Sequence, residues 1–452
     1  MAANEFRLPF GLRALASPQG VRRRLPLLLV LLLALAVRLP YAPDPAYRGD
    51  LVHFAEWVRA IDQHGLVHFY DVDLRLGAWD RPYPPLPTIA FGAMLQAYGA
   101  APEPRAALND VTFVLMLKLF PLVAELALIA AVQLWLSDRA SRLRWLIPAL
   151  LALHPGLIAT SAWWGQYDSP FMVFLVLALF SLNRDRPLSA WVLFAVALLI
   201  KQPAAALAPL FLVVTFRRCG WRQTALGMTA GVGLYALVTL PFALGSGLEA
   251  ALSPYLKASD AYPFVSNNAY NTWHALATLV KGGPMLFMEP RFRDSLPFLG
   301  PLTAKTTGFL LLGGFALWMM AVMWRQAHER REFVWATALF MGFFMLPTQV
   351  HERYLYPATV LALVAIAQDR RFWWPALGLV VTMSYNVLAV LVPVRWPGAD
   401  LGPARYALPV GIVNLVIFLQ LLRLTGFPRT APAPLPEPPA RRSTPPHRAK
   451  TS

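Results

Sequence analysis

Long apolar runs recur along the chain from Leu25 to Leu424, and short polar segments separate them. Each run is continuous and does not alternate between apolar and polar residues, so the runs predict membrane-spanning helices. Basic residues gather in every second gap, and short cytoplasmic loops of membrane proteins carry an excess of Lys and Arg. The pattern therefore places the basic gaps in the cytoplasm and the gaps between them on the external side.

The spacing of the runs predicts twelve spans, with both ends of the chain in the cytoplasm. Two pairs of spans turn at a polar motif, Lys201–Pro203 or His351–Arg353, because one kinked helix at either place would put a flanking basic cluster outside. The predicted spans are residues 25–39, 111–136, 145–162, 169–182, 188–200, 204–216, 224–244, 303–324, 333–349, 354–367, 372–392 and 407–424.

This topology leaves two long external loops, residues 40–110 and 245–302. The first loop contains Tyr83–Tyr98, which is apolar enough to resemble a span. Counting it as a span would reverse the sides of every later loop and put basic residues outside. We therefore expect Tyr83–Tyr98 to form a helix that lies in the membrane interface or dips into the membrane.

The two ends of the chain differ from the membrane domain, residues 25–424. Residues 1–24 predict a basic cytoplasmic N-terminus. The apolar run that follows resembles a signal peptide, but bulky residues stand where cleavage requires small ones, so we expect an uncleaved first span. Residues 428–452 are rich in Pro, Ala and Arg and predict a disordered cytoplasmic tail.

Composition supports a membrane protein and argues against a nucleic-acid partner. Hydrophobic residues make up 57% of the 452 residues, and the mean hydropathy is +0.49. The net charge of +16 comes from basic residues in short loops beside apolar runs, where they face lipid headgroups. The single cysteine, Cys219, and the scattered histidines form no metal-ligand pattern, so we expect neither a metal nor a cofactor.

Asp50 lies in the first external loop and leads a helix-like stretch that continues to Trp57. One interpretation is a plain helix cap, since Asp is a preferred residue at that position. The other is a general base, because a carboxylate is the usual group that removes a proton from a sugar hydroxyl.

A second motif, Trp163–Ser169, joins two spans on the same side. An aromatic belt explains the tryptophans, and Asp168 or Ser169 could cap the next helix. Neither explains Gln166, and Trp164, Gln166 and Asp168 together could bind sugar hydroxyls.

Glu125 lies inside an apolar span, where an ionisable residue is costly and is a functional candidate. The alternative is a structural pair with Lys118 or with a neighbouring span.

Three basic or titratable residues, Lys201, His351 and Arg353, lie on the external side against the charge bias of the loops. Their side chains could extend to the interface from helix ends. They could also form a cationic site for the phosphate of a lipid carrier, which Lys and Arg bind well.

Five short motifs follow one another along the chain: Gly49–Asp50, Tyr83–Leu86, Gln166–Asp168, Lys201–Gln202 and His351–Arg353. With them the chain resembles the polytopic GT-C glycosyltransferases. The nearest resemblance is to the dolichyl-phosphate-glucose-dependent glucosyltransferases of N-glycan assembly, which carry corresponding motifs in this order, and to the second GPI mannosyltransferase with its bacterial relatives. Asp168 stands where the glucosyltransferases have asparagine, and Arg353 where they have lysine, so the sugar preference does not transfer.

The resemblance implies an all-α, polytopic GT-C fold of about twelve transmembrane helices with a long first periplasmic loop. It implies metal-independent, inverting transfer of a hexose such as mannose or glucose from a polyprenyl-phosphate carrier. The acceptor would be a hydroxyl of a lipid-linked or surface glycan at the periplasmic face of a bacterial inner membrane. Asp50 would be the base, and Lys201, His351 and Arg353 would hold the donor phosphate. The residues that would bind sugar or acceptor are Tyr83, Trp164, Gln166, Asp168, Gln202 and Glu352.

Three other classes fit parts of the pattern. A transporter or flippase of lipid-linked saccharides fits the number of spans, but transporters often show internal repeats and polar residues near the middle of the membrane. A glycan polymerase or ligase would use a pyrophosphate donor, and the sequence separates it poorly from the first interpretation. A non-catalytic membrane scaffold leaves the clustered external motifs unexplained.

Overall fold

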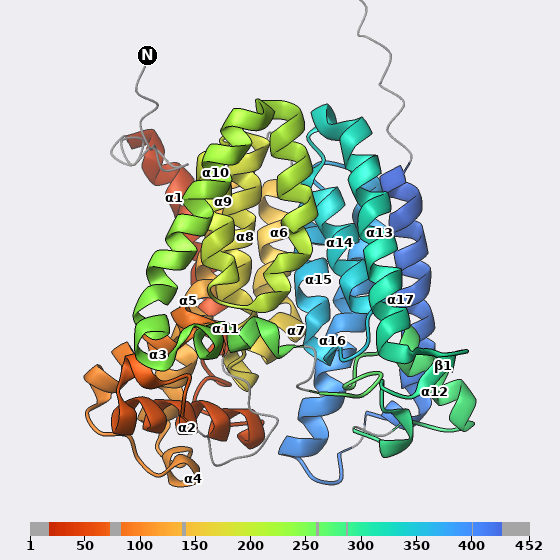
Figure 1. Cartoon of the computed structure of the whole chain (residues 1–452). Coiled ribbons are helices and arrows are strands. Elements are labelled where there is room, and N and C mark those ends of the chain that lie inside the picture. Colours follow the sequence, from red (N-terminus) through yellow and green to blue (C-terminus); the bar gives the residue numbers. More distant parts are fainter. Residues whose placement is uncertain are drawn as a thin grey trace, which may run out of the picture.

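The computed structural model describes residues 18–72, 83–137, 142–258, 262–285, 288–399 and 401–426. Most of the predicted N-terminal segment and the whole predicted tail lie outside these residues. Within the described ranges the molecule is almost entirely helical (Figure 1). Its one sheet there is an antiparallel hairpin of β1 (Pro297–Leu299) and β2 (Leu302–Thr303). The predicted all-α polytopic fold is confirmed.

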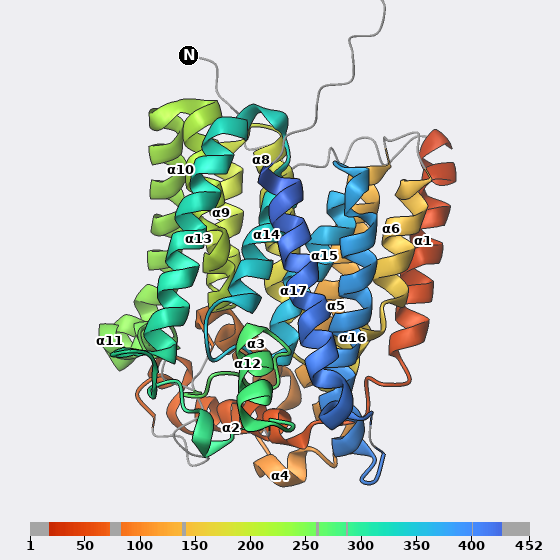
Figure 2. The same ribbon diagram turned by 90° about the vertical axis from the view of Figure 1, so that its right-hand side faces the viewer.

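Long helices lie side by side in a bundle, as two views at right angles show (Figures 1 and 2). In the described part of the chain, five helical segments are long and apolar enough to cross a membrane by length and composition. A sixth is added if the bent pair α6 (Leu143–Leu153) and Pro155–Trp164, with 47° between its halves, counts as one span. The five contain α5 (Val111–Leu136), α10 (Ala208–Ser246), α13 (Ala304–Gln326), α16 (Trp373–Arg395) and α17 (Pro403–Gly426).

Shorter helices fill the interior and one side of this bundle. Three of them, α8 (Asp168–Asn183), α14 (Glu332–Met345) and α15 (Tyr356–Ala365), are buried along almost their whole length. Because their ends rest on protein and not on lipid, they do not need the full thickness of a bilayer. With α1 (Pro18–Arg38) and α9 (Pro187–Leu198), helices coincide with all the predicted spans. The number of actual crossings stays a prediction.

The longest helix, α10, contains a reversal of the chain. Gly220 has φ 79° and ψ 169°, outside helical geometry, and the helix runs up to it and back down again (Figure 1). Only glycine adopts this backbone conformation easily. The turn lies between Arg218 and Arg222, so it divides α10 into two helical halves. The basic cluster predicts a turn between two spans at this place.

The short helices gather at one end of the bundle, which the basic-loop rule predicts to be external (Figure 1). We call them, with the β-hairpin, the external layer. At the opposite end lie the basic turns after α8, within α10, and before α14 and α16. The helices of the external layer are α2 (Arg48–His64), η2 (Leu66–His68), α3 (Pro85–Tyr98), α4 (Pro104–Ala107), α11 (Leu248–Leu256), α12 (Thr272–Lys281) and η6 (Pro290–Phe292).

The apolar segment Tyr83–Tyr98 forms α3, which packs against α2 and α5. It has 14 residues and is not among the candidate spans of the described chain. Its Phe91 packs in an aromatic cluster with Phe54 and Trp57 of α2, at ring-centroid distances of 5.7 and 6.0 Å. This placement agrees with a helix outside the bundle, and its depth in the bilayer stays a prediction.

Glu125, the ionisable residue inside α5, forms a structural ion pair. Its Oε2 lies 2.7 Å from Arg38 Nε, and both side chains are buried. Ser161 and Tyr356 also donate hydrogen bonds to this carboxylate. The partner is a residue of a neighbouring helix, as one alternative predicted, and it is not Lys118. Removing one member of such a buried pair costs about 3–5 kcal/mol, because the other charge stays buried.

The two ends of the bundle should differ in their access to reagents. In a Cys219→Ser background, His64→Cys in the external layer should react with an impermeant thiol reagent applied to whole cells. Gln223→Cys, which is equally exposed at the basic end, should react only after the membrane is permeabilised. The opposite pattern would overturn the predicted sides.

Candidate active site

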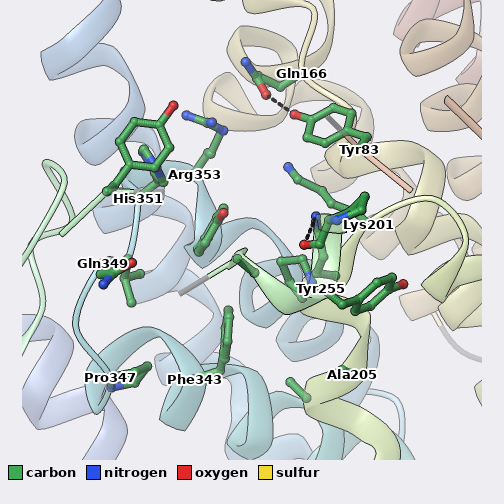
Figure 3. A pocket seen from close by; sticks show the side chains of 18 of the residues that line it. Tyr83, Gln166, Lys201, Ala205, Tyr255, Phe343, Pro347, Gln349, His351 and Arg353 are labelled. Carbon is green, nitrogen blue, oxygen red and sulfur yellow. Dashed lines mark hydrogen bonds between the residues drawn. The ribbon is translucent and has the colours of Figure 1, made fainter. Parts of the chain in front are cut away.

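The polar motifs meet at the end of the bundle that carries the external layer, around a cavity of about 400 Å³. Figure 3 shows Gln166, Tyr83, Lys201 and Arg353 around one part of the cavity. Seven of the ten predicted site residues line it: Asp50, Tyr83, Gln166, Lys201, Gln202, His351 and Arg353. The other three do not line the cavity but bond to residues that do: Trp164 to Asp50, Asp168 to Lys201, and Glu352 to Arg353.

Asp50 lies in the first turn of α2, and its side chain is 24% exposed. The N-cap of this helix is Tyr47, so Asp50 is not the cap. Its Oδ2 accepts hydrogen bonds from Trp164 Nε1 at 3.0 Å and Gln166 Nε2 at 2.5 Å. Two N–H donors thus hold this carboxylate at the cavity wall.

The two donors come from a single turn of the chain. A widened helical turn, η3 (Ala159–Trp164), ends at Gly165, whose φ is 83°. A Cβ atom at Gly165 would lie 2.9 Å from Lys118 Cγ. Both the left-handed backbone conformation and this close contact therefore require glycine. The hydroxyl of Tyr83 donates to Gln166 Oε1 at 3.1 Å, which turns the amide N–H₂ group of Gln166 toward Asp50.

Lys201 forms a buried ion pair with Asp168. Lys201 Nζ lies 2.8 Å from Asp168 Oδ1, and the side chains are 2% and 1% exposed. Asp168 is the first residue of α8 but makes no capping hydrogen bond, so the cap interpretation is wrong for it. Removing Lys201 alone would leave a buried, unpaired carboxylate, so Lys201→Ala should perturb folding.

Arg353 reaches the cavity from η8 (Glu352–Leu355). Its Nη1 donates to Glu352 Oε1 at 2.7 Å, and its Nη2 lies 4.0 Å from Asp50 Oδ2. The guanidinium also lies over the indole ring of Trp164, 5.2 Å from the ring centroid. These contacts fix a planar group with several N–H donors beside the carboxylate of Asp50.

His351 lies opposite Lys201 across the cavity, between a loop and a helix. Its backbone pairs with Asn267 and Asn268 in the loop before α12, and its ring packs edge-on against Tyr262, with 4.6 Å between the ring centroids. Burial, and then the charges of Arg353 and Lys201, hold the pKa of His351 well below its usual value. The imidazole is therefore neutral at physiological pH and offers hydrogen bonds without charge.

The charges of the site differ from the cationic site that the sequence predicts. Among the ten predicted residues, three are carboxylates and two are cations, since His351 is neutral. Each cation has a carboxylate within 2.8 Å. Because the buried interior of the site has a low dielectric constant, an unpaired charge there would destabilise the fold.

The structure adds residues that the sequence did not single out. His53 lines the cavity one turn after Asp50, and the helical spacing of three residues could have indicated it. Tyr262 and Gln349 also line it. They belong to a loop and to a turn with φ 64° at Gln349, and no local pattern places them there.

The remaining wall of the cavity is apolar. Phe309 of α13, Phe343 of α14 and Ala205 of η4 (Gln202–Leu207) line it. Figure 3 shows Phe343, Pro347 and Ala205 at the end away from Gln166. The cavity therefore joins a polar, hydrogen-bonding part to an apolar part between membrane helices.

No group of three His, Cys, Asp or Glu side chains in the described ranges could hold a metal ion. The expectation of a metal-independent reaction stays a prediction.

Comparisons with known proteins agree with the resemblance carried by the five motifs. Residues 105–394 match the model of the ALG6, ALG8 glycosyltransferase family. The chain is also 25% identical over 368 residues to the dolichyl pyrophosphate Glc1Man9GlcNAc2 alpha-1,3-glucosyltransferase of Arabidopsis thaliana. That similarity covers 74% of this chain and 71% of the relative. The motifs at 49–50 and 83–86 precede the family match, and the fold brings them to the same cavity.

The low pKa of His351 should make the protein sensitive to acid. The unfolded chain binds a proton at His351 below about pH 6.5, whereas the native site does so only at lower pH. Unfolding free energy should therefore fall as the pH falls, by about 1.4 kcal/mol per pH unit from this group. When the pH of purified samples is lowered from about 7.5 to 5.5, the melting temperature of His351→Gln should fall by less than that of the parent protein.

The control is His64→Gln, because His64 is exposed on the external layer. It should keep the acid sensitivity of the parent protein. An unchanged sensitivity in His351→Gln would contradict a buried, neutral His351.

Proposed function

Because this chain belongs to the ALG6, ALG8 glycosyltransferase family, we propose that it transfers glucose from polyprenyl-phosphate glucose to a hydroxyl of a lipid-linked glycan. Membership makes it a multi-pass membrane hexosyltransferase. The donor, the side of the membrane and the mechanism are our proposal. The sequence left mannose and glucose open, and similarity to the Arabidopsis glucosyltransferase favours glucose.

One observation carries the proposal: a carboxylate and a guanidinium face the same cavity 4.0 Å apart, each held by further partners. Asp50 has its two N–H donors, and Arg353 has Glu352. Glycosyl transfer to a hydroxyl from a lipid phosphate needs a base for the hydroxyl proton and a cation for the departing phosphate.

In the proposed reaction, Asp50 takes the proton of the acceptor hydroxyl while the hydroxyl oxygen attacks the anomeric carbon. The bond from that carbon to the phosphate oxygen breaks, and a single displacement inverts the configuration. Trp164 and Gln166 both bind Oδ2 of Asp50, so Oδ1 is the oxygen that we assign to the incoming proton.

The lipid phosphate leaves with an additional negative charge. Arg353 can offer several N–H donors in one plane, and Lys201 keeps N–H donors beyond the one that Asp168 accepts. Neutral His351 can add a hydrogen bond. In a site with little water these groups stabilise the developing charge more strongly than they would in bulk solvent.

The two parts of the cavity suit the two parts of such a donor. Tyr83, Gln166, Gln202 and the residues behind them would contact the sugar. The apolar wall that includes Phe309 and Phe343 would contact the polyprenyl chain at the membrane edge. We infer that α3, beside this end of the bundle, helps to admit the lipid.

The proposed side of the membrane is the external one, which is periplasmic in a bacterial inner membrane, because the basic turns lie at the other end. A flippase would need polar residues along a path through the membrane. Here the site residues cluster at one end, next to one cavity. A polymerase or ligase would differ in using a pyrophosphate donor.

Purified protein should be assayed in nanodiscs with radiolabelled polyprenyl-phosphate glucose, polyprenyl-phosphate mannose and polyprenyl-pyrophosphate-linked sugar, and with a lipid-linked glycan extract as acceptor. We expect transfer from the glucose donor and release of polyprenyl phosphate. Transfer from the pyrophosphate donor alone would favour a polymerase or ligase. Movement of the intact lipid-linked sugar across the bilayer without transfer would favour a flippase.

Asp50→Asn should separate a base from a structural residue. Asparagine keeps the size of aspartate and does not accept a proton at neutral pH. Transfer should fall about a hundredfold or more, the usual contribution of a general base, while donor binding persists. Asp168→Asn is the matched variant, because Asp168 bonds Lys201 from behind the cavity wall. Near-normal turnover in Asp50→Asn with an inactive Asp168→Asn would move the base to Asp168.

A further inference from the structure

Lys118 is a buried cation that the proposed chemistry does not use. It lies on the second turn of α5, and its side chain is fully buried. Among the described residues it forms no ion pair with a carboxylate. Its Nζ instead lies within hydrogen-bond distance of four backbone carbonyl oxygens, those of Tyr41, Asp44, Ala162 and Trp163.

These carbonyls belong to two separate segments of the chain. Those of Ala162 and Trp163, at 3.0 and 2.7 Å, end the turn η3, where helical carbonyls lack partners along the helix. That of Asp44, at 2.5 Å, belongs to the segment that leads from α1 into α2. One ammonium group therefore ties the turn before Gly165 to the approach to Asp50.

The stem of Lys118 touches the same turn. A Cβ atom at Gly165 would lie 2.9 Å from Lys118 Cγ and 3.3 Å from Leu51 Cδ2. Leu51 follows Asp50 directly, and Trp164 and Gln166 flank Gly165. The turn thus packs closely against both Lys118 and α2, at the place where its two side chains bind the carboxylate.

We propose that Lys118 is a positioning residue, which sets the orientation of the Asp50 carboxylate through the turn Trp164–Gln166. This inference rests on the proposed role of Asp50 as the base. Burying an ammonium group is unfavourable unless its N–H groups are satisfied, and here backbone oxygens from both segments satisfy them. An apolar residue of the same length would fill the space but would bind neither segment.

The test compares Lys118→Met with Arg331→Met in the full-length protein in nanodiscs. Arg331 is also buried, but it binds Asp369 and the carbonyl of Leu424 at the basic end. Hydrogen–deuterium exchange in the peptide covering residues 159–167 should become faster in Lys118→Met and stay unchanged in Arg331→Met. The exchange rate does not depend on activity, so it tests whether Lys118 holds the turn in place even if the proposed function fails.

Kinetics with polyprenyl-phosphate glucose then test the link to Asp50. In Lys118→Met, kcat should fall about ten- to a hundredfold, because a displacement of about 1 Å in a reacting group has effects of that size. KM for the donor should change little. In an Asp50→Asn background, Lys118→Met should cause no further fall, since the base is already absent.

Three results would overturn the proposal: unchanged exchange in residues 159–167, an unchanged kcat per folded molecule, or a full additional loss in the Asp50→Asn background. If Lys118→Met does not fold, Lys118→Gln serves in its place, because its amide keeps two N–H donors but loses the third. It should still show faster exchange in residues 159–167 and a lower kcat than the parent protein, and parent-like values of both would refute the role of Lys118.

Discussion

The hydrogen bonds that Trp164 and Gln166 donate to Asp50 are the contacts on which the site depends. They join the first helix of the external layer to a turn between two helices of the bundle. Tyr83, two residues before α3, extends the network to Gln166, and Arg353 extends it from η8. Four distant parts of the chain therefore converge on one carboxylate, and each restricts the position of the others.

The same principle governs the buried charges elsewhere. A charge at the edge of a bilayer is stable only when a partner lies close to it, and the described part of the molecule supplies one in each case discussed. Glu125 has Arg38, Asp168 has Lys201, and Lys118 has backbone carbonyls. These pairs link helices that are far apart in sequence, so they fix the bundle around the cavity as well as the cavity itself.

The cavity combines two environments because of where it lies. Its polar part is built from helix starts and turns, where side chains and backbone groups are not used in regular hydrogen bonding. Its apolar part is built from the sides of α13 and α14 and from η4, which face other membrane helices. The donor that we propose has a sugar phosphate for the polar part and a long hydrocarbon chain for the apolar part.

The sequence by itself determined the membrane class and the helical segments, and it predicted that the motifs gather at one end of the bundle, because hydropathy and loop charge are local properties. It also predicted ten site residues, and all ten line one cavity or bond to its lining. Only the tertiary structure decided their partners. Glu125 pairs with Arg38, and Lys201 with Asp168, because helix packing chooses among residues far apart in sequence. The neutral state of His351 likewise follows from burial, which depends on the whole fold.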